Sequence, residues 1–563
     1  MSASPAFDQG LGLADGLDRD TVAAILEAAG RFAEDTLAPL NSVGDRHGCN
    51  LTPDGVTTAP GFAKAYRAFS LGGWNSLSAD PAYGGQGLPK ILEMAVFEIF
   101  QGANMAFSLC PMLTQGTIEA LAKHGDARQK ALYLPPLVSG EWTGAMALTE
   151  AQAGTDLAAL STRAEPDSQG GYRLFGQKIF ITWGDHDCAD NIVHLVLARL
   201  PGAPEGVKGI SLFLASKHHV GSDGSLGERN DFRAIGLENK LGIHGSPTCV
   251  IQYEGARAER IGEAHEGLAQ MFTMMNAARL HVGVQGVGIA ERAFQQALAY
   301  AGERRQGKSA FTGQANAVLF DHPDVRRQLL LMKAKIAAGR AMCLAAAAAS
   351  DLSCMGADAD IRESARLREE FLTPIVKAWC TDMAVQVASD ALQLHGGAGY
   401  IEETGAAQCY RDARIGPIYE GVNAIQAVDL AFRKLPMVDS RAWREHLGEL
   451  SRTGADLIAR SESSLQRLGH SLAQAQNYAL KSADWLLAQG RTPGALAGAG
   501  AFLTQVGDLL AAEALGKQAL VSSLGVAMAD VFSNSVLSGA AGLTTAAMQG
   551  ARSIETLTPQ DLS

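Results

Sequence analysis

One glutamate stands among apolar neighbours with the character of a catalytic base. Glu420 lies in Ile415-Gly416-Pro417-Ile418-Tyr419-Glu420-Gly421-Val422, a run that contains no other carboxylate. Removing a carboxyl group from water raises its pKa above the usual value of ~4.3, and a carboxylate tuned in this way can accept a proton from carbon. The alternative is a solvated glutamate at the start of a helix, where acidic residues are common.

The segment from Ala147 to Asp156 combines small residues with hydroxyl groups. It reads Ala-Leu-Thr-Glu-Ala-Gln-Ala-Gly-Thr-Asp, so a strand runs into a turn with little side-chain bulk at Ala153-Gly154. A planar ligand can approach the backbone there, with the hydroxyls of Thr149 and Thr155 as donors. The alternative is an ordinary strand-to-loop turn that its threonine and aspartate side chains stabilise.

Two further segments have the character of a cofactor site. Residues 176–182 alternate apolar and polar side chains and would present Phe180 and Thr182 from one face of a strand. An aromatic ring beside a hydroxyl suits a flavin-like ring, although core packing explains the phenylalanine equally well. Residues 393–400 form a glycine-rich loop whose backbone N–H groups suit phosphates. This loop lacks the surroundings of a dinucleotide fold and the Gly-Lys-Ser/Thr of a P-loop.

The elements that must position these residues change character along the chain. Residues 1–143 read as helices, and Asp20 is the expected N-cap of the first one. Residues 144–263 contain short runs of β-formers between turns, which predict an antiparallel sheet or barrel. The helical period returns over residues 264–435. Residues 436–563 are helical again, with a glycine-rich break near residues 491–500, so the predicted class is α+β, mainly α.

Together these segments, in this order and with these gaps, resemble the acyl-CoA dehydrogenase family of flavoproteins. Residues 148–156 match its Leu-Thr-Glu-x-x-x-Gly-Thr-Asp signature and residues 393–400 match Gln-x-x-Gly-Gly-x-Gly-Tyr. Residues 419–421 match its Tyr-Glu-Gly active-site turn. The resemblance covers roughly residues 20–435. It implies the family's N-terminal helical domain, middle antiparallel β domain and C-terminal helical bundle, to which this chain adds further helices.

The resemblance implies FAD-dependent dehydrogenation of an acyl-CoA thioester to the trans-2-enoyl-CoA. Glu420 would remove a proton from the α-carbon, and a hydride would pass from the β-carbon to flavin N5. The Glu420 backbone N–H and a flavin ribityl hydroxyl would hold the thioester oxygen, which acidifies the α-proton. An electron-transfer flavoprotein would then accept the electrons.

The resemblance also implies a role for further residues. Substrate contacts fall at Thr155, Arg279 and Gly421, although a structural ion pair inside a helix bundle is the alternative for Arg279. Val422 stands where the family commonly has a threonine, so its contact would come from the backbone. The implied FAD contacts are Met146, Leu148, Thr149, Thr155, Phe180, Thr182, Arg304, Gln393, Gly397, Val422 and Ala424.

Three of those residues imply an oligomer. Arg304, Gln393 and Gly397 match positions that reach the FAD of a neighbouring subunit, so the resemblance implies a homo-oligomer. The last 128 residues (563 − 435) resemble the extension of longer bacterial members, a subgroup with an enzyme for the thioether substrate 3-methylthiopropionyl-CoA. Such an extension favours a dimer over the family's common tetramer.

The composition of the chain limits its expected partners, metal sites and localisation. The 563 residues include 59 acidic and 47 basic ones, for a net charge of −12, which disfavours nucleic acid as a partner. The eight cysteines show no C-x-x-C spacing, so we expect free thiols and no metal site. The first basic residue is Arg19, so no signal peptide is expected, and the apolar runs look too short to span a membrane. These features predict a cytoplasmic protein.

Two alternatives to the dehydrogenase stay open at this point. An acyl-CoA oxidase would use the same half-reaction and return the electrons to oxygen. A non-catalytic scaffold would keep the fold and use the added helices to bind partners, although Glu420 and most of the flavin positions are retained.

Overall fold

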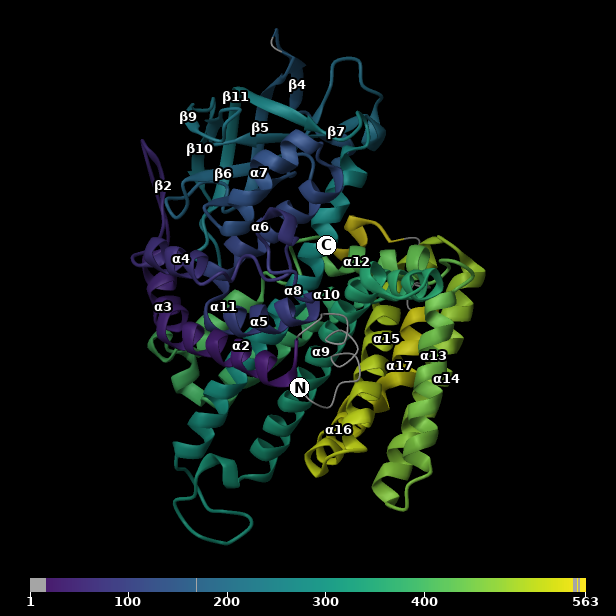
Figure 1. Ribbon diagram of the computed structural model, residues 1–563. Helices are drawn as coiled ribbons and strands as arrows, with labels where there is room; N and C mark the ends of the chain where they lie inside the picture. The colour runs from purple at the N-terminus through teal and green to yellow at the C-terminus, as the bar shows by residue number, and fades with distance from the viewer. Residues whose placement is uncertain (1–16, 169, 550–553, 555–556) are drawn as a thin grey trace. The chain divides into compact units, whose positions relative to one another are not determined.

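The computed structural model describes residues 17–168, 170–549, 554 and 557–563 (Figure 1). The chain divides into two compact units. Residues 19–89 and 99–281 form the sheet unit, whereas residues 90–98 and those from 282 onward belong to the helical unit. The sequence predicted four domains, with boundaries after residues 143, 263 and 435. The division into two units does not test these boundaries, so they stay predictions.

Helices precede the sheet, as expected. They are α2 (Arg19–Phe32) with the π-helical turn η1 (Ala33–Leu37), α3 (Ala38–His47), α4 (Phe62–Leu71), α5 (Lys90–Ala103), α6 (Met105–His124) and α7 (Ala127–Ser139). Strands β1 (Asn50–Thr52) and β2 (Gly55–Thr57) form a separate hairpin. Asp20 is not the N-cap of α2, because the helix already begins at Arg19; its carboxylate lies in the first turn, where it still faces the positive end of the helix.

Seven strands form the main sheet in the order β10-β11-β5-β4-β6-β3, with β7 paired to β11 and β6. They are β3 (Trp142–Ala147), β4 (Arg163–Pro166), β5 (Tyr172–Thr182), β6 (Asn191–Arg199), β7 (Ile210–Ser216), β10 (Phe232–Leu237) and β11 (Thr248–Ile261). Strands β8 (His218–Val220) and β9 (Leu226–Arg229) form a second hairpin. The main sheet is antiparallel as predicted, except that β6 runs parallel to β3 and to the end of β4. Helices α6 and α7 pack against β3.

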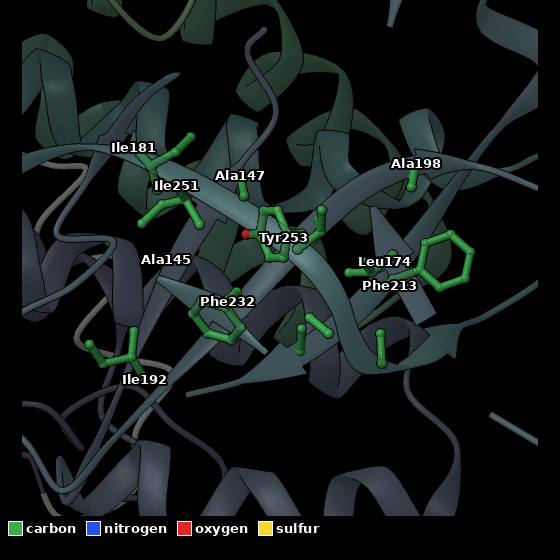
Figure 2. Close-up of a cluster of buried hydrophobic side chains, with 14 of the residues drawn as sticks. Ala145, Ala147, Leu174, Ile181, Ile192, Ala198, Phe213, Phe232, Ile251 and Tyr253 are labelled. Atoms are coloured by element: carbon green, nitrogen blue, oxygen red, sulfur yellow. The ribbon is translucent and has the colours of Figure 1, made fainter. Parts of the chain in front are cut away.

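The core of the sheet unit is mainly apolar, and polar groups that it buries are paired. Figure 2 shows Tyr253 and Phe232 side by side in this core, with ring centroids 5.3 Å apart. The hydroxyl of Tyr253 lies 2.7 Å from Nδ1 of His194, so neither buried polar group lacks a partner. The core therefore fixes the strands that end at the candidate site.

The helical unit is built on α9 (Pro323–Met355), α10 (Ala359–Leu394) and the part of α8 (Gly267–Glu303) from residue 282 onward. Helices α8 and α10 approach closely at Gly286, where a Cβ atom would lie 2.6 Å from the carbonyl oxygen of Cys380. Shorter elements follow: η6 (Gly396–Tyr400), η7 (Glu402–Thr404), α11 (Ala406–Ala413), α12 (Asn423–Asp429) and the π-helical turn η8 (Leu430–Lys434).

The predicted extension is helical. It contains α13 (Arg441–Ile458), α14 (Ser463–Gln489), α15 (Pro493–Ala519), α16 (Ser523–Ser535), η9 (Leu537–Gly539), α17 (Ala540–Gln549) and η10 (Pro559–Leu562). The break predicted at residues 491–500 was too long, because only residues 490–492 separate α14 from α15. The glycines beyond them are helical and serve packing, since a Cβ on Gly498 would overlap the backbone of Ala547 in α17.

Within the part of the extension that the structure describes, two stretches are long and apolar enough to cross a membrane by length and composition, residues 493–519 and 523–549. The expectation that every apolar run is too short was therefore wrong. Within the structure, 67% of the apolar window of the first stretch and 33% of that of the second are buried. Burial of this kind is what a core helix requires, so α15 passes the composition test as the central helix of the extension.

Candidate active site

The turn between α11 and α12 carries Glu420. Glu420 adopts φ +55° and the following Gly421 adopts φ +84°. The left-handed region costs a non-glycine residue on the order of 1–3 kcal/mol, whereas glycine enters it freely. The Gln426 side chain compensates, because its Nε2 donates to the carbonyl oxygens of Glu420 and Gly421 at 3.3 and 3.2 Å. The strained residue is the one predicted to be the base.

Tyr419 attaches the same turn to α8. Its hydroxyl donates a hydrogen bond to Oε1 of Gln285, a buried side chain. Burial, reinforced by the nearby Glu420, raises the pKa of Tyr419, so the phenol stays protonated and keeps donating. Glu420 is half-buried and lies three residues before α12 begins. It is therefore not the solvated helix-start glutamate considered as the alternative.

In the sheet unit, a buried ion pair holds the loop that follows β3. The ammonium group of Lys178 donates to the carbonyl oxygen of Leu148 at 2.8 Å and to Oε1 of Glu150 at 2.9 Å. Burial would raise the pKa of Glu150, but Lys178 and hydrogen bonds from Ser161 and Thr162 lower it to about 2. Since the carboxylate stays charged, it keeps this loop in one conformation.

Phe180 points away from the core of the sheet unit. It has φ +59° and its side chain is 57% exposed, so the core-packing alternative for this ring is wrong. The pairing of β5 with β11 shifts register between Lys178 and Ile181, and this bulge turns the intervening residues outward. The backbone N–H of Ile179 donates to the carbonyl oxygen of Thr149 at 2.9 Å. The structure thus brings the two predicted flavin-contacting segments of this unit together.

The remaining sheet-unit residues vary in exposure. Met146, Thr149 and Thr182 are half-buried, Thr155 is exposed and Leu148 is buried. The exposed Gly154 has no atom within 4 Å of where a Cβ would stand, so the loop backbone is open to a ligand, as predicted.

Arg279, from α8, is buried. Its Nη1 donates to Oδ1 of Asn276 at 3.2 Å, and its guanidinium lies 5.8 Å from the centre of the Phe272 ring. Both contacts come from within the same helix. They hold the Arg279 side chain against its own helix.

A third group of predicted residues lies where α8 and α10 end. The rings of Tyr300 and His395 pack 4.6 Å apart and hold the two helix ends together. Arg304, Gln393 and Gly397 are all exposed beside this contact, and a Cβ on Gly397 would meet nothing within 4 Å. Open backbone next to an arginine suits a phosphate group.

The Gly397 loop and the Glu420 turn are well separated along α10. Asn423, which follows the turn, hydrogen-bonds to Asp382, twelve positions before Leu394 at the helix end. At 1.5 Å per residue this is about 18 Å along the helix. Within the turn itself Val422 is half-buried and Ala424 is exposed.

These features fit FAD. An exposed aromatic ring beside threonine hydroxyls suits the isoalloxazine ring, and the open glycine backbone suits the pyrophosphate. Among the described residues, no group of three or more His, Cys, Asp or Glu side chains is arranged to hold a metal ion, and all eight cysteines are free thiols.

Sequence reasoning missed three residues that hold predicted site residues in place, Lys178 within the sheet unit and Gln285 and Asn423 within the helical unit. Only Lys178 left a signal, because it is a charged residue in the middle of a run of β-formers. Gln285 lies 134 residues from the tyrosine that it binds, and Asn423 looks like any polar residue at a helix start.

A cavity of about 840 Å³ lies elsewhere in the helical unit, between α9, α10, α13 and α15. None of the predicted cofactor or substrate residues lines it. Its walls combine alanines of α9 with the paired charges Arg368, Glu449 and Lys517. A search for the site by cavity size alone would therefore have selected a different part of the helical unit.

Comparison with protein families gives three matches in the order of the predicted domains. Residues 19–141 match the N-terminal domain of acyl-CoA dehydrogenases, residues 145–256 the middle domain and residues 265–435 the C-terminal domain.

Individual relatives agree with these matches. A 3-methylmercaptopropionyl-CoA dehydrogenase of Ruegeria pomeroyi is 44% identical over 92% of this chain and 91% of its own length. A butyryl-CoA dehydrogenase of Syntrophomonas wolfei is 34% identical over 79% of this chain and 74% of its own. The structure of an acyl-CoA dehydrogenase from Bacillus anthracis complexed with FAD shares the fold, with a TM-score of 0.77, 21% identity and coverage of 96% and 91% of the two chains.

Proposed function

Because the chain belongs to the acyl-CoA dehydrogenase family, whose members use FAD to dehydrogenate acyl-CoA thioesters, we propose that Glu420 is its catalytic base. The observation that carries this proposal is the left-handed turn in which Tyr419 and Gln426 hold the glutamate. A strained residue that its neighbours over-determine is typical of a catalytic position.

In the proposed reaction the Glu420 carboxylate takes the proton from the α-carbon of the acyl group. The backbone N–H of Glu420 donates to the thioester oxygen, where negative charge develops as the proton leaves. FAD, when bound, supplies the acceptor for the hydride from the β-carbon. Phe180, Thr149 and Thr182 orient the flavin ring, whereas Arg304, Gln393 and Gly397 bind the FAD of a neighbouring subunit.

We propose 3-methylthiopropionyl-CoA as the substrate. Support comes from the 44% identity to a dehydrogenase for this thioester, an alignment that includes the extension. Butyryl-CoA is the second candidate, because two butyryl-CoA dehydrogenases are each 34% identical to this chain. A panel of acyl-CoAs from short to long decides between them: a higher kcat/KM for butyryl-CoA than for the thioether would refute the first proposal.

Replacement of Glu420 by Gln tests the base. The Glu420→Gln protein should keep its FAD absorbance, because the amide matches the carboxylate in size, but acyl-CoA should no longer bleach the flavin. A general base contributes roughly 100-fold to 10,000-fold to a rate. Bleaching at the wild-type rate would refute the assignment.

For the acceptor we propose an electron-transfer flavoprotein. The yield of hydrogen peroxide distinguishes a dehydrogenase from an oxidase. Turnover under air should give little peroxide relative to product, whereas one peroxide for each product molecule would establish an oxidase. The scaffold alternative is not supported, because the relatives are enzymes at substantial identity.

We further propose a cytoplasmic homodimer. The exposed Arg304 and Gln393 side chains and the open backbone at Gly397 support an oligomer, since these groups would complete a cofactor site on another copy. Light scattering of the holoenzyme should give twice the chain mass of 59.1 kDa. A monomer that binds FAD with full affinity would refute this proposal.

A further inference from the structure

The carboxylate of Glu420 must point at one carbon atom, yet it sits at the apex of a loop. Helix α12 begins at Asn423, and the backbone N–H of this residue donates to the carbonyl oxygen of Pro417 at 3.0 Å. The bond closes a seven-residue loop, residues 417–423, in which Glu420 is the middle residue. Any contact that holds Asn423 in place therefore also holds the closed end of this loop in place.

The Asn423 side chain is bound on both of its polar atoms by α10. Its Oδ1 accepts a hydrogen bond from the Lys377 ammonium group at 2.8 Å. Its Nδ2 donates to Oδ1 of Asp382 at 2.9 Å and also contacts Oγ1 of Thr381 and the carbonyl oxygen of Ala378, at 3.1 and 3.2 Å.

This arrangement places a neutral amide between a buried cation and an anion. Lys377 is fully excluded from solvent, whereas Asp382 is exposed. The amide matches both partners at once, because its oxygen faces the ammonium donor and its nitrogen faces the carboxylate acceptor. Neither aspartate nor alanine at position 423 can satisfy both.

A close contact fixes the other end of the turn to the same helix. Gly416 lies so near Thr381 that a Cβ would stand 2.9 Å from its Cγ2 atom. The loop is thus attached to one region of α10 at both ends, and Tyr419 attaches it to α8.

We propose that Asn423 is a positioning residue, which, held by Lys377 and Asp382, aligns the Glu420 carboxylate with the substrate α-carbon. This inference rests on the proposal that Glu420 is the base. Asn423→Ala leaves the backbone bond to Pro417 in place, so the loop should still form but lose its side-chain anchor. A misplacement of about 1 Å can cost roughly 100-fold in rate.

The first test separates alignment from folding. Asn423→Ala should keep its FAD absorbance and lower kcat and the rate of flavin bleaching by roughly 100-fold, with KM changed less than about threefold. The control is Asn534→Ala, which removes an asparagine bonded to Asp530 on α16 and should change neither constant. A wild-type kcat for Asn423→Ala would overturn the proposal.

The second test exchanges the amide and the carboxylate. Asn423→Asp should be as slow as the alanine variant, because two carboxylates then face each other. Asp382→Asn should be nearly silent, because an amide oxygen still accepts the bond. The double variant, Asn423→Asp with Asp382→Asn, again contains one amide and one carboxylate and has the wild-type net charge. Its kcat should be at least about tenfold higher than that of Asn423→Asp alone.

The exchange decides the matter even if Asn423→Ala does not fold. A double variant that binds FAD but is no faster than Asn423→Asp would overturn the proposal. Glu420→Gln is measured in the same assay. Normal flavin bleaching in Glu420→Gln would refute the proposal that Glu420 is the base. An inactive Glu420→Gln together with a fully active Asn423→Ala would refute only the positioning role of Asn423.

Discussion

The ammonium group of Lys178 lies 2.9 Å from Oε1 of Glu150, and both side chains are excluded from solvent. The same ammonium group binds the carbonyl oxygen of Leu148. One buried ion pair thus joins strand β5, which presents Phe180, to the loop that presents Thr149 and Thr155. The pair determines the shape of the proposed flavin-binding surface within the sheet unit.

Lys178→Met should destabilise the protein and weaken FAD binding. Removing one partner of a buried pair leaves an uncompensated charge, at a cost of about 3–5 kcal/mol. The expected result is a lower thermal midpoint of the apoprotein and a larger Kd for FAD. Lys123→Met, at an exposed position near the end of α6, is the matched control. Unchanged midpoint and Kd in the Lys178 variant would contradict this role.

Phe180→Ala should weaken FAD binding without destabilising the apoprotein. The ring is 57% exposed, so its removal opens no cavity in the core. Loss of a stacking ring worth about 0.5–1.5 kcal/mol should raise the Kd for FAD roughly twofold to twelvefold. Titration of apoprotein with FAD measures the change, and Leu71→Ala, at a 90% exposed position in α4, serves as the control. A large drop in apoprotein stability would show that the ring is structural.

His446→Leu should make the protein less sensitive to acid. Burial, with a contribution from Arg368, lowers the pKa of His446 to about 3, whereas an unfolded histidine titrates near ~6.5. Above about pH 6.5 the ring is neutral in both states. Between that pH and the folded-state pKa only the unfolded state takes up the proton, so stability falls as the pH falls, by about 1.4 kcal/mol per pH unit.

Thermal midpoints at several pH values between about 7 and 5 measure this effect. The decrease toward the acid end should be smaller in His446→Leu than in the wild type. His470 is exposed on α14, so His470→Leu should keep the wild-type dependence. Parallel curves for the wild type and the His446 variant would exclude the histidine as a source of acid sensitivity.

Asp508→Ala should loosen the extension where it meets α10. The Trp379 indole N–H donates to Oδ1 of Asp508 at 2.9 Å. Burial raises the pKa of Asp508 to about 6, so the charge itself does not stabilise the fold and the hydrogen bond is what the substitution removes. An indole N–H left unpaired costs about 1–3 kcal/mol, so the alanine variant should have a lower thermal midpoint. Asp508→Asn keeps an acceptor and should match the wild type; equal losses in both variants would contradict the hydrogen bond.

Short local patterns were enough to predict the fold class and the candidate base. The Tyr-Glu-Gly turn identifies Glu420, and the structure confirms that this glutamate occupies a distinctive turn and not the first turn of a helix. Periodicity likewise predicted the order of helices, sheet and helices. Local patterns gave a wrong prediction at the glycines near residue 498, which were expected to break a helix. Gly498 lies inside α15, and α17 packs so closely against it that a Cβ atom would overlap the backbone of Ala547.

The exposure of Phe180 could not be read from the chain, because a bulge in the pairing of β5 with β11 sets it. The amino-acid sequence specifies which chemical groups are available: a glutamate before a glycine, threonines beside small residues and a glycine-rich loop. The orientation of these groups comes from tertiary packing. Gln285 holds Tyr419 from 134 positions away and Lys178 holds Glu150 from 28, and contacts of that span exist only once helices and strands have packed.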